Sequence, residues 1–317
     1  MTPKHRVTFG VKTSQANTTY EEVVRIWREA DRVPVFEHAW LWDHLVPLRG
    51  EVTGPALEAW TLLAALAGQT ERLRLGVIVT SNRLRPPAVL AKMAATVDRI
   101  SKGRLVFGIG AGGSAVRDPA GLALVRRELD AYGISVVPTG EAIDALDEAC
   151  VIAKRMWSET EPFDFDGRWY QLKGAICEPK PVQPGGPPIL MGAGGNRSLR
   201  VVARHADIWN CPTRGDVATF RDLSRILDDA CAQIGRDPSE IERSVQLLVN
   251  ASRTAAPAAQ PGLPQIADAA TTRELIVEFI DAGVSHIVLA PIAADSDRPV
   301  QWLADEIVEP VRQQLRL

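Results

Sequence analysis

The sequence predicts a (β/α)₈ barrel, a closed ring of parallel strands surrounded by helices, within a chain of 317 residues. Eight strand-like runs alternate with helical segments, and this alternation is typical of a parallel α/β fold. The segment 73–113 shows the unit most clearly, because two apolar runs flank one helix of about twelve residues, long enough for a parallel crossover. A doubly wound open sheet is the competing architecture, but the count of eight and the late run at His286 favour the barrel.

The strands are identified by short apolar runs between polar or glycine-rich boundaries. The third run ends in two hydroxyl side chains, Thr80 and Ser81, and the fourth ends in glycines that let a backbone approach a ligand closely. The eight strands are expected at residues 6–10, 38–42, 73–80, 105–111, 188–192, 208–211, 245–251 and 286–290.

A helix is expected after each strand. The first helix gathers valine, isoleucine and tryptophan side chains on one apolar face. The helix after the seventh strand has Thr271 or Thr272 as its expected N-cap. The helices are expected at residues 21–30, 57–67, 88–99, 140–157, 199–205, 217–234, 272–282 and 300–314.

Two segments depart from this alternation within a single expected domain, 1–317. Residues 160–187 contain Phe165-Asp166-Gly167-Arg168-Trp169-Tyr170 and then many prolines, which indicates a hairpin-bearing insertion between the fourth and fifth barrel units. Residues 251–270 are rich in alanine and proline and are expected to form a flexible loop after the seventh strand. A lid over the active face and a disordered low-complexity loop are both compatible with that composition.

The composition argues against several classes of function. The formal net charge is −3, so there is no basic excess that would favour nucleic acid or an anionic membrane as a partner. The longest apolar runs have strand length, far below the ~20 residues of a membrane span, and no apolar signal segment follows the first residues, so a cytoplasmic location is expected. The four cysteines form no CxxC pair and the five histidines no HExxH pattern, so no metal site is expected.

Candidate site residues follow the expected strands, because the carboxyl ends of barrel strands carry the active site in this architecture. Asp43 and His44 come directly after the second strand. A histidine at this place can give or take a proton near neutral pH, and the aspartate can hold its tautomer or bind a ligand. A turn aspartate beside a structural histidine is the alternative interpretation.

Two glycine-rich turns follow later strands. The turn at 108–113 does not have the spacing of the dinucleotide pattern GxGxxG, so by itself it is a weak signal. The turn at 192–198 opens a helix, where successive backbone amides favour a phosphate and Arg197 can add positive charge. An ordinary βα turn with a helix cap explains the second turn equally well.

Two further titratable residues are expected to be structural. His286 begins the eighth strand, where a histidine at the bottom or in the core of the barrel is expected rather than a ligand. Glu58 lies near the start of a helix, and a helix-end charge is a simpler interpretation than a catalytic acid.

Longer motifs in the chain resemble those of a known family. The matching segments are Trp42-Asp43-His44-Leu45, 71–82, 87–104, 131–134, 165–170, 179–183, 187–195 and 206–210. Together they resemble the bacterial luciferase-like monooxygenase superfamily, and most nearly its oxidoreductases that use the deazaflavin coenzyme F-420. The resemblance covers roughly residues 6–235 and implies a (β/α)₈ barrel with an isoalloxazine-like ring at the carboxyl end of its strands.

The resemblance also implies roles for individual residues. By it, Asp43 contacts the cofactor and His44 transfers a proton. A non-proline cis peptide bond is implied at Ile78-Val79, where it forms a bulge behind the ring. The other implied cofactor contacts are Thr80 or Ser81 at the ring or ribityl region, Ala111 and Gly112 along the cofactor, and Gly194 and Gly195 near its phosphate.

The chain departs from the family pattern at Gly113. The deazaflavin sugar-phosphate dehydrogenases carry a catalytic glutamate there, and many relatives carry a tryptophan. An apparent insertion, 114–121, follows, and the segment 113–131 is expected to be a loop that shapes the substrate pocket. Because the general acid of the sugar-phosphate enzymes is missing, their substrate is not assigned to this chain.

Three functions are compatible with these observations. The first is a hydride-transferring oxidoreductase that uses coenzyme F-420 on a small organic substrate, with His44 as the proton-transfer residue. The alternative is a monooxygenase that takes reduced FMN from a separate reductase and excludes water from its site. A non-catalytic flavin-binding protein is the third, since a fold does not establish function. A homodimer is expected, because two-fold homo-oligomers are common.

Overall fold

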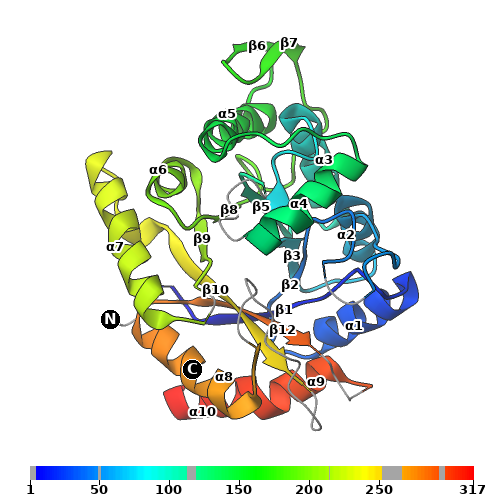
Figure 1. The fold of residues 1–317 in the computed structure, drawn as a ribbon, viewed down its shortest axis with the longest axis vertical. Helices are drawn as coiled ribbons and strands as arrows, with labels where there is room; N and C mark the ends of the chain where they lie inside the picture. The colour runs from blue at the N-terminus through cyan, green and yellow to red at the C-terminus, as the bar shows by residue number, and fades with distance from the viewer. Residues whose placement is uncertain (1–4, 49–50, 113–118, 214, 252–265, 293–296) are drawn as a thin grey trace.

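The computed structural model describes residues 5–317 apart from 49–50, 113–118, 214, 252–265 and 293–296. Eight parallel strands form its barrel: β1 (Thr8–Lys12), β2 (His38–Leu41), β3 (Arg74–Val77), β5 (Leu105–Gly110), β8 (Ile189–Gly192), β9 (Ile208–Cys211), β10 (Glu242–Asn250) and β12 (His286–Ile292). They pair in this order, and β12 pairs back to β1, so the ring closes (Figure 1). The predicted (β/α)₈ barrel is therefore confirmed over the open sheet.

The third barrel strand is interrupted. A two-residue strand, β4 (Thr80–Ser81), continues β3 after a break and pairs with β5. Within that break, the Ile78-Val79 peptide bond is cis, at the position that the family resemblance implied. Another two-residue strand, β11 (Ile266–Ala267), pairs with β10 and lies within the segment 251–270 that was expected to be a loop. Most of that segment, 252–265, lies outside the described residues.

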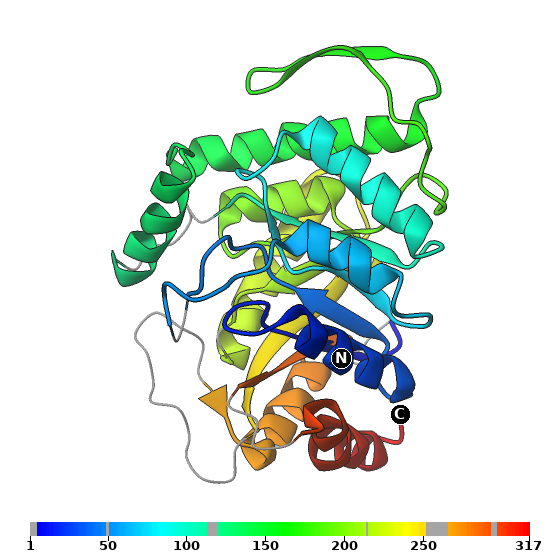
Figure 2. The same cartoon turned by 90° about the vertical axis from the view of Figure 1, so that its right-hand side faces the viewer.

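Helices surround the barrel (Figure 2). They are α1 (Tyr20–Arg32), α2 (Ala59–Ala67), α3 (Pro87–Ile100), α4 (Pro119–Ala131), α5 (Thr139–Ser158), α6 (Asn196–His205), α7 (Val217–Gln233), α8 (Ala269–Asp281), α9 (Pro299–Leu303) and α10 (Glu309–Leu315). A 3₁₀ turn covers Pro238–Glu240. A π-helical turn over Ala304–Val308 separates α9 from α10, so the expected helix 300–314 is not regular throughout.

The N-cap of α8 corrects one sequence prediction. Neither Thr271 nor Thr272 caps the helix; Asp268 does, and its carboxylate accepts the backbone N–H of Thr271 at 2.8 Å. Aspartate is as strong an N-cap as serine or asparagine and stronger than threonine, and here it stands one residue before the first helical position.

Helix α4 is the main element that the sequence analysis missed. The segment 113–131 was expected to be a loop, but Pro119–Ala131 is helical. Because α4 follows β5 directly, it lies at the carboxyl end of the barrel. Figure 2 shows it at the left, projecting beyond the strand ends on the side away from the two termini. A new helix therefore stands over the face where the site was expected.

The expected insertion, 160–187, contains a hairpin. The strands β6 (Phe163–Asp166) and β7 (Gln171–Ala175) pair antiparallel and project at the top of Figure 2. Glu148 of α5 holds the hairpin turn, because its carboxylate accepts the backbone N–H groups of Arg168, Trp169 and Tyr170 at 2.8, 2.9 and 3.0 Å. The insertion is thus attached to the outer helices of the barrel.

The barrel interior is filled near its bottom by aromatic side chains. Trp40 is fully buried there among apolar side chains. A Cβ atom at Gly76 would come within 2.6 Å of the Trp40 ring, so only glycine leaves room for it. The indole N–H of Trp40 donates to His38 Nδ1 at 2.7 Å, and the His38 ring stacks on His286 with centroids 3.9 Å apart. His286 is therefore a buried core histidine, as predicted.

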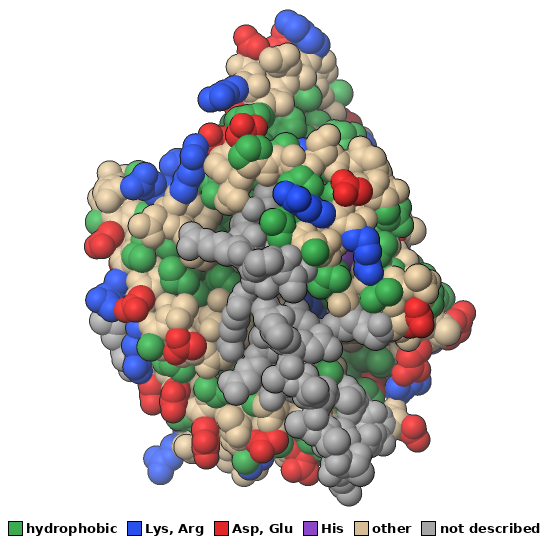
Figure 3. Space-filling view, viewed as in Figure 1, with side chains coloured by type: hydrophobic (Ala, Val, Ile, Leu, Met, Phe, Trp, Pro, Cys, Tyr) green, Lys and Arg blue, Asp and Glu red, His purple; other side chains and the backbone are tan. Residues whose placement is uncertain are grey.

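The face of the molecule drawn in Figure 3 carries charged and hydrophobic side chains together. In Figure 3, side chains of both signs lie around the edge of the visible face. Among the described residues, no helix combines the length and apolarity needed to cross a membrane.

The four cysteines are buried free thiols, and burial raises the pKa of Cys150 and of Cys211 to about 12.

Candidate active site

The segment after β2 is anchored before it reaches the candidate residues. Gln15, fully buried in the connection between β1 and α1, bonds both backbone groups of Trp42. Its Oε1 accepts the Trp42 N–H at 3.3 Å, and its Nε2 donates to the Trp42 carbonyl. The indole of Trp42 lies beside the His44 ring, with centroids 5.2 Å apart. The backbone that presents Asp43 and His44 is therefore held by the connection between β1 and α1.

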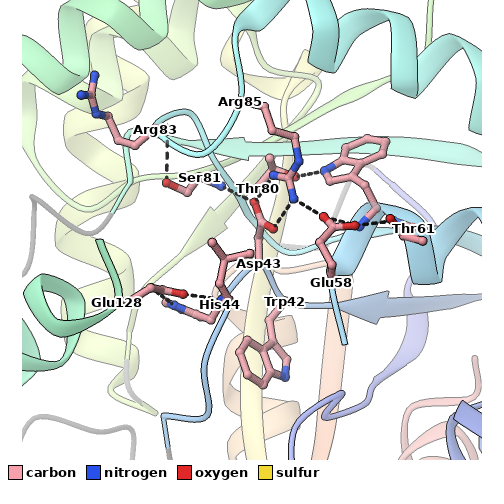
Figure 4. Close-up of polar contacts among 12 residues, drawn as sticks. Trp42, Asp43, His44, Glu58, Thr61, Thr80, Ser81, Arg83, Arg85 and Glu128 are labelled. Carbon is pink, nitrogen blue, oxygen red and sulfur yellow. Dashed lines mark hydrogen bonds and ion pairs between the residues drawn. The ribbon is translucent and has the colours of Figure 1, made fainter. Parts of the chain in front are cut away.

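Asp43 binds two groups that come from the end of the third barrel strand. Its side chain is 0% exposed. Arg85 Nη1 and Nη2 donate to Oδ2 and Oδ1 at 2.8 and 3.0 Å, and the Ser81 N–H donates to Oδ2 at 3.0 Å (Figure 4). A bidentate guanidinium–carboxylate pair is among the stronger polar interactions in proteins. Asp43 thus links the end of β2 to β4.

Arg85 joins a second carboxylate to this group. It contacts Glu58, which is the N-cap of α2 and accepts the N–H groups of Trp60 and Thr61 at 3.1 and 2.7 Å. Burial opposes the charge of Glu58, but these hydrogen bonds and Arg85 outweigh it and lower the pKa of Glu58. Burial likewise opposes the charge of Arg85, yet its two carboxylate partners raise its pKa. The helix-end interpretation of Glu58 is confirmed, with an ion pair added.

His44 is paired with a residue that the sequence analysis did not find. Its Nδ1 lies 2.8 Å from Oε2 of Glu128 on α4, and the other oxygen of Glu128 accepts the Leu45 N–H (Figure 4). The Glu128 side chain is 4% exposed, whereas that of His44 is 30% exposed. The two residues stand 84 positions apart in the chain. Only a recognised helix at 119–131 could have indicated that an acid there would reach the end of β2.

The same helix holds the next residues of the segment. Arg127 donates to the Pro47 carbonyl at 2.9 Å, and the Tyr132 hydroxyl donates to the Leu45 carbonyl at 3.3 Å. Together with Glu128, these contacts fix the segment 44–47 against the C-terminal half of α4 and the turn that follows it.

The two predicted hydroxyls have different surroundings. Thr80 is fully buried, and its Oγ1 accepts the indole N–H of Trp60 at 3.1 Å. Ser81 is only half-buried and lies beside Gly112, because a Cβ atom at Gly112 would come within 2.7 Å of Ser81 Oγ. Gly112 has a φ of +88°, which disfavours any other residue. The structure therefore brings Ser81 and Gly112 together at the strand ends; Gly113 lies outside the described residues.

The turn at 192–198 caps a helix, which is one of the two interpretations that the sequence left open. Gly195 is the N-cap of α6, and Ser198 Oγ both accepts its N–H and donates to its carbonyl, at 3.2 and 2.9 Å. Arg197 binds Asp144 of α5 at 2.7 and 2.6 Å. Its charge is therefore already paired with a carboxylate, and a phosphate at this turn would depend on the backbone amides of Gly194 and Gly195.

Two buried polar atoms near Ser81 have no hydrogen-bond partner within the described part of the chain: Asn82 Oδ1 and Arg83 Nε. The amide nitrogen of Asn82 donates to the hydroxyl of Tyr170 at 3.1 Å. Tyr170 comes from the insertion, and burial raises its pKa. Buried polar atoms are rarely left unpaired in native proteins, so these two mark a place where a polar ligand would be satisfied.

Comparison with known proteins places the chain in a family. Residues 5–309 match the family described as luciferase-like monooxygenase, and the chain belongs to that family. The resemblance found in the sequence motifs is therefore confirmed.

Two curated relatives show the range of similarity. An F420-dependent glucose-6-phosphate dehydrogenase of Kineococcus radiotolerans is 30% identical over 216 residues, which cover 68% of this chain and 59% of that protein. A phthiodiolone/phenolphthiodiolone dimycocerosates ketoreductase of Mycobacterium tuberculosis is 33% identical over 189 residues, 58% of this chain and 45% of that protein. The matched part thus spans about half the length of these relatives.

Solved structures share the fold. An F420-dependent secondary alcohol dehydrogenase, in complex with an F420-acetone adduct, superposes with a TM-score of 0.78 at 18% identity, over 97% of this chain and 99% of that one. A long-chain alkane monooxygenase superposes with a TM-score of 0.77 at 14% identity, over 99% and 92%. At these identities the likeness concerns the barrel alone.

Proposed function

We propose that this protein is an oxidoreductase that uses coenzyme F-420 to interconvert an alcohol and a carbonyl group in a small organic substrate. The observation that carries the proposal is His44 itself. It lies in the family motif at the end of β2, is 30% exposed, and has one ring nitrogen held by a buried carboxylate. A histidine so placed is suited to exchange a proton with a substrate near neutral pH. The two curated relatives are named as a dehydrogenase and a ketoreductase, which supports the alcohol–carbonyl class.

The residues at the carboxyl end of the barrel fit a flat anionic cofactor. Gly112 is held in a conformation that a side chain would disturb, and it lies against Ser81. The unpaired atoms of Asn82 and Arg83 offer an acceptor and a donor. When bound, F-420 would supply the donor or acceptor of a hydride. The residues proposed to hold it are Asp43, Ile78, Val79, Thr80, Ser81, Ala111, Gly112, Gly194 and Gly195.

Within this set, Asp43 is proposed to act through its neighbours. Its carboxylate oxygens are occupied by Arg85 and the Ser81 N–H, so it fixes the backbone of Ser81 beside the cofactor position. Because the Thr80 hydroxyl is bonded to Trp60, Ser81 is the better candidate for a side-chain contact with the cofactor. His44 would exchange the proton of the substrate hydroxyl.

The alternative is a monooxygenase that uses reduced FMN from a separate reductase. The description of the matching family favours it, because that description names monooxygenases. The proposed homodimer is common to both alternatives.

Cofactor titration decides between these functions. The chain is titrated separately with F-420 and with oxidised and reduced FMN, and the fluorescence of its eight tryptophans is followed. Tight binding of F-420, with turnover of secondary alcohols or ketones, is the expected result. Tight binding of reduced FMN alone would favour the monooxygenase. Binding of neither would contradict the assignment of the glycines.

The role of His44 is tested by a pair of variants. His44→Ala is expected to lower kcat about 10²–10⁴-fold, the usual contribution of a general acid or base, while the Kd for F-420 changes little. His5→Gln is the matched control, because His5 binds the carbonyl of Ser239, far from the segment after β2. Equal losses of turnover and cofactor binding in His44→Ala would contradict the proton-transfer role.

A further inference from the structure

We propose that Glu128 is the positioning residue of the site: it fixes the tautomer of His44 and thereby leaves Nε2 as the ring nitrogen that meets the substrate. The inference rests on the proposed function only for the substrate proton; the pairing itself is a property of this chain. Neither the family motif around His44 nor the glycine at position 113 indicates it.

The hydrogen-bond geometry determines which ring nitrogen carries the hydrogen. An ionised carboxylate can only accept hydrogen bonds. Glu128 accepts the Leu45 N–H with one oxygen and faces His44 Nδ1 at 2.8 Å with the other. Nδ1 must therefore be the donor, and the neutral imidazole has its free lone pair at Nε2.

Both partners are held so that this pairing is preorganised. Glu128 is 4% exposed, and the segment after β2 is also contacted by Arg127 of the same helix and by Tyr132, which directly follows it. On the other side, Gln15 fixes the backbone two residues before His44. Because the carboxylate and the imidazole are already fixed relative to each other, the ring keeps one tautomer and no side-chain entropy is lost when the substrate reacts.

Asp43 is not available for the same task. Although it is adjacent to His44 in the sequence, its two oxygens bind Arg85 and the Ser81 N–H. The structure therefore divides two roles between two carboxylates: Asp43 organises the end of the third strand, and Glu128 organises His44.

The proposed arrangement accounts for every proton in the reaction. When an alcohol is oxidised, its O–H bond breaks and His44 Nε2 accepts the proton, while the hydrogen on carbon leaves with its electron pair to the cofactor that the proposed function supplies. The imidazolium so formed keeps Nδ1–H on Glu128, whose negative charge stabilises it without taking the proton. Reduction of a carbonyl runs the same transfers in reverse.

The tautomer can be measured without any cofactor. The ¹⁵N shifts of the histidine side chains are recorded on the full chain above neutral pH, and the His44 signals are assigned by their loss in His44→Ala. We expect the Nδ1–H form in the wild-type protein. In Glu128→Gln, the amide oxygen can still accept the Leu45 N–H while its NH₂ donates to Nδ1, so the ring should switch to the Nε2–H form.

A matched variant and a kinetic measurement complete the test. Asp130→Asn makes the same chemical change at an exposed position two residues along α4, and it should leave the tautomer and kcat unchanged. Glu128→Gln should lower kcat by about 10²-fold or more, because a wrong tautomer removes the proton acceptor, with little change in KM or in the Kd for F-420.

The outcomes separate the two proposals. A wild-type ring in the Nε2–H form, or one that does not change in Glu128→Gln, would overturn the positioning role whatever the activity. The tautomer of the wild-type ring is measured without any variant, so it tests the positioning role even if Glu128→Gln fails to fold. The expected tautomers together with no turnover of alcohols or ketones by the F-420-loaded chain would support the positioning role and contradict the proposed function.

Discussion

Replacing Arg85 by methionine should destabilise the fold at the end of the third barrel strand. Arg85 provides two of the three hydrogen bonds to Asp43, whose side chain is 0% exposed. Methionine keeps an apolar stem in place but leaves the carboxylate buried with one partner. Removing one member of a buried ion pair costs about 3–5 kcal/mol, because the other charge is left uncompensated.

The expected shift in melting temperature follows from the size of the chain. For 317 residues, the entropy of unfolding is about 0.7 kcal/mol per degree, so the loss corresponds to a fall in Tm of about 4–8 °C. The Asp43→Asn variant should lose less, because Arg85 retains Glu58 as a partner. The double variant, Asp43→Asn with Arg85→Met, should be more stable than Arg85→Met alone, because no buried charge is left unpaired.

Calorimetry of the wild-type protein, the two single variants and the double variant measures the coupling between Asp43 and Arg85 directly. A change in Tm below about 1 °C for Arg85→Met would refute the reasoning, since a loss that small corresponds to under about 1 kcal/mol. Strictly additive losses in the double variant would refute it as well, because they would show that Asp43 and Arg85 do not depend on each other.

Three further predictions concern the barrel interior, the strand ends and the insertion. Burial lowers the pKa of His286 to about 3 from 6.5 and holds that of His38 well below its ordinary value. As the pH falls, these histidines therefore take up protons in the unfolded chain before they do so in the folded protein. The free energy of unfolding should decrease as the pH falls from about 6.5 toward 3, by about 5 kcal/mol for His286 alone. A free energy of unfolding in urea that stays constant from pH 6.5 to 4 would contradict this. Gly112→Ala should weaken F-420 binding about tenfold or more, because the new Cβ would clash with the side chains of Ser81 and Arg83. Gly133 also has a positive φ but has open space around it, so Gly133→Ala should leave the Kd for F-420 unchanged. Equal Kd values for the two variants in a fluorescence titration would argue against the assignment of Gly112. Glu148→Ala removes the acceptor of three backbone N–H groups in the β6–β7 turn. It should raise the rate of amide hydrogen exchange in that hairpin and leave the barrel strands protected. Faster exchange throughout the barrel would show that the insertion is not a separate unit.

The architecture could be predicted because its signals are local and repeated. Each barrel strand is a short apolar run, and each crossover contains a segment with helical periodicity, so neighbouring residues contain the information. The stretch 113–131 was the exception. There a glycine-rich strand end and an apparent insertion obscured the helix α4, whose pattern was not read as helical.

The candidate site divides in the same way. The Asp43-His44 pair could be found in the chain because it follows a recognisable strand, and the position of the cis bond at Ile78-Val79 was implied by the family resemblance. The partners of those residues were not accessible. Arg85 reaches Asp43 from 42 positions away, and Glu128 reaches His44 from 84 positions away.

The sequence by itself therefore determined the barrel and the position of His44 after its second strand, at the carboxyl end where the candidate site is proposed. Only the tertiary structure decided which carboxylate contacts that histidine and which one is paired with Arg85. The physical reason is the separation in sequence over which each kind of interaction acts. Hydrophobic periodicity acts between residues a few positions apart, whereas a hydrogen bond between side chains depends on where a closed barrel brings the ends of separate strands and helices together.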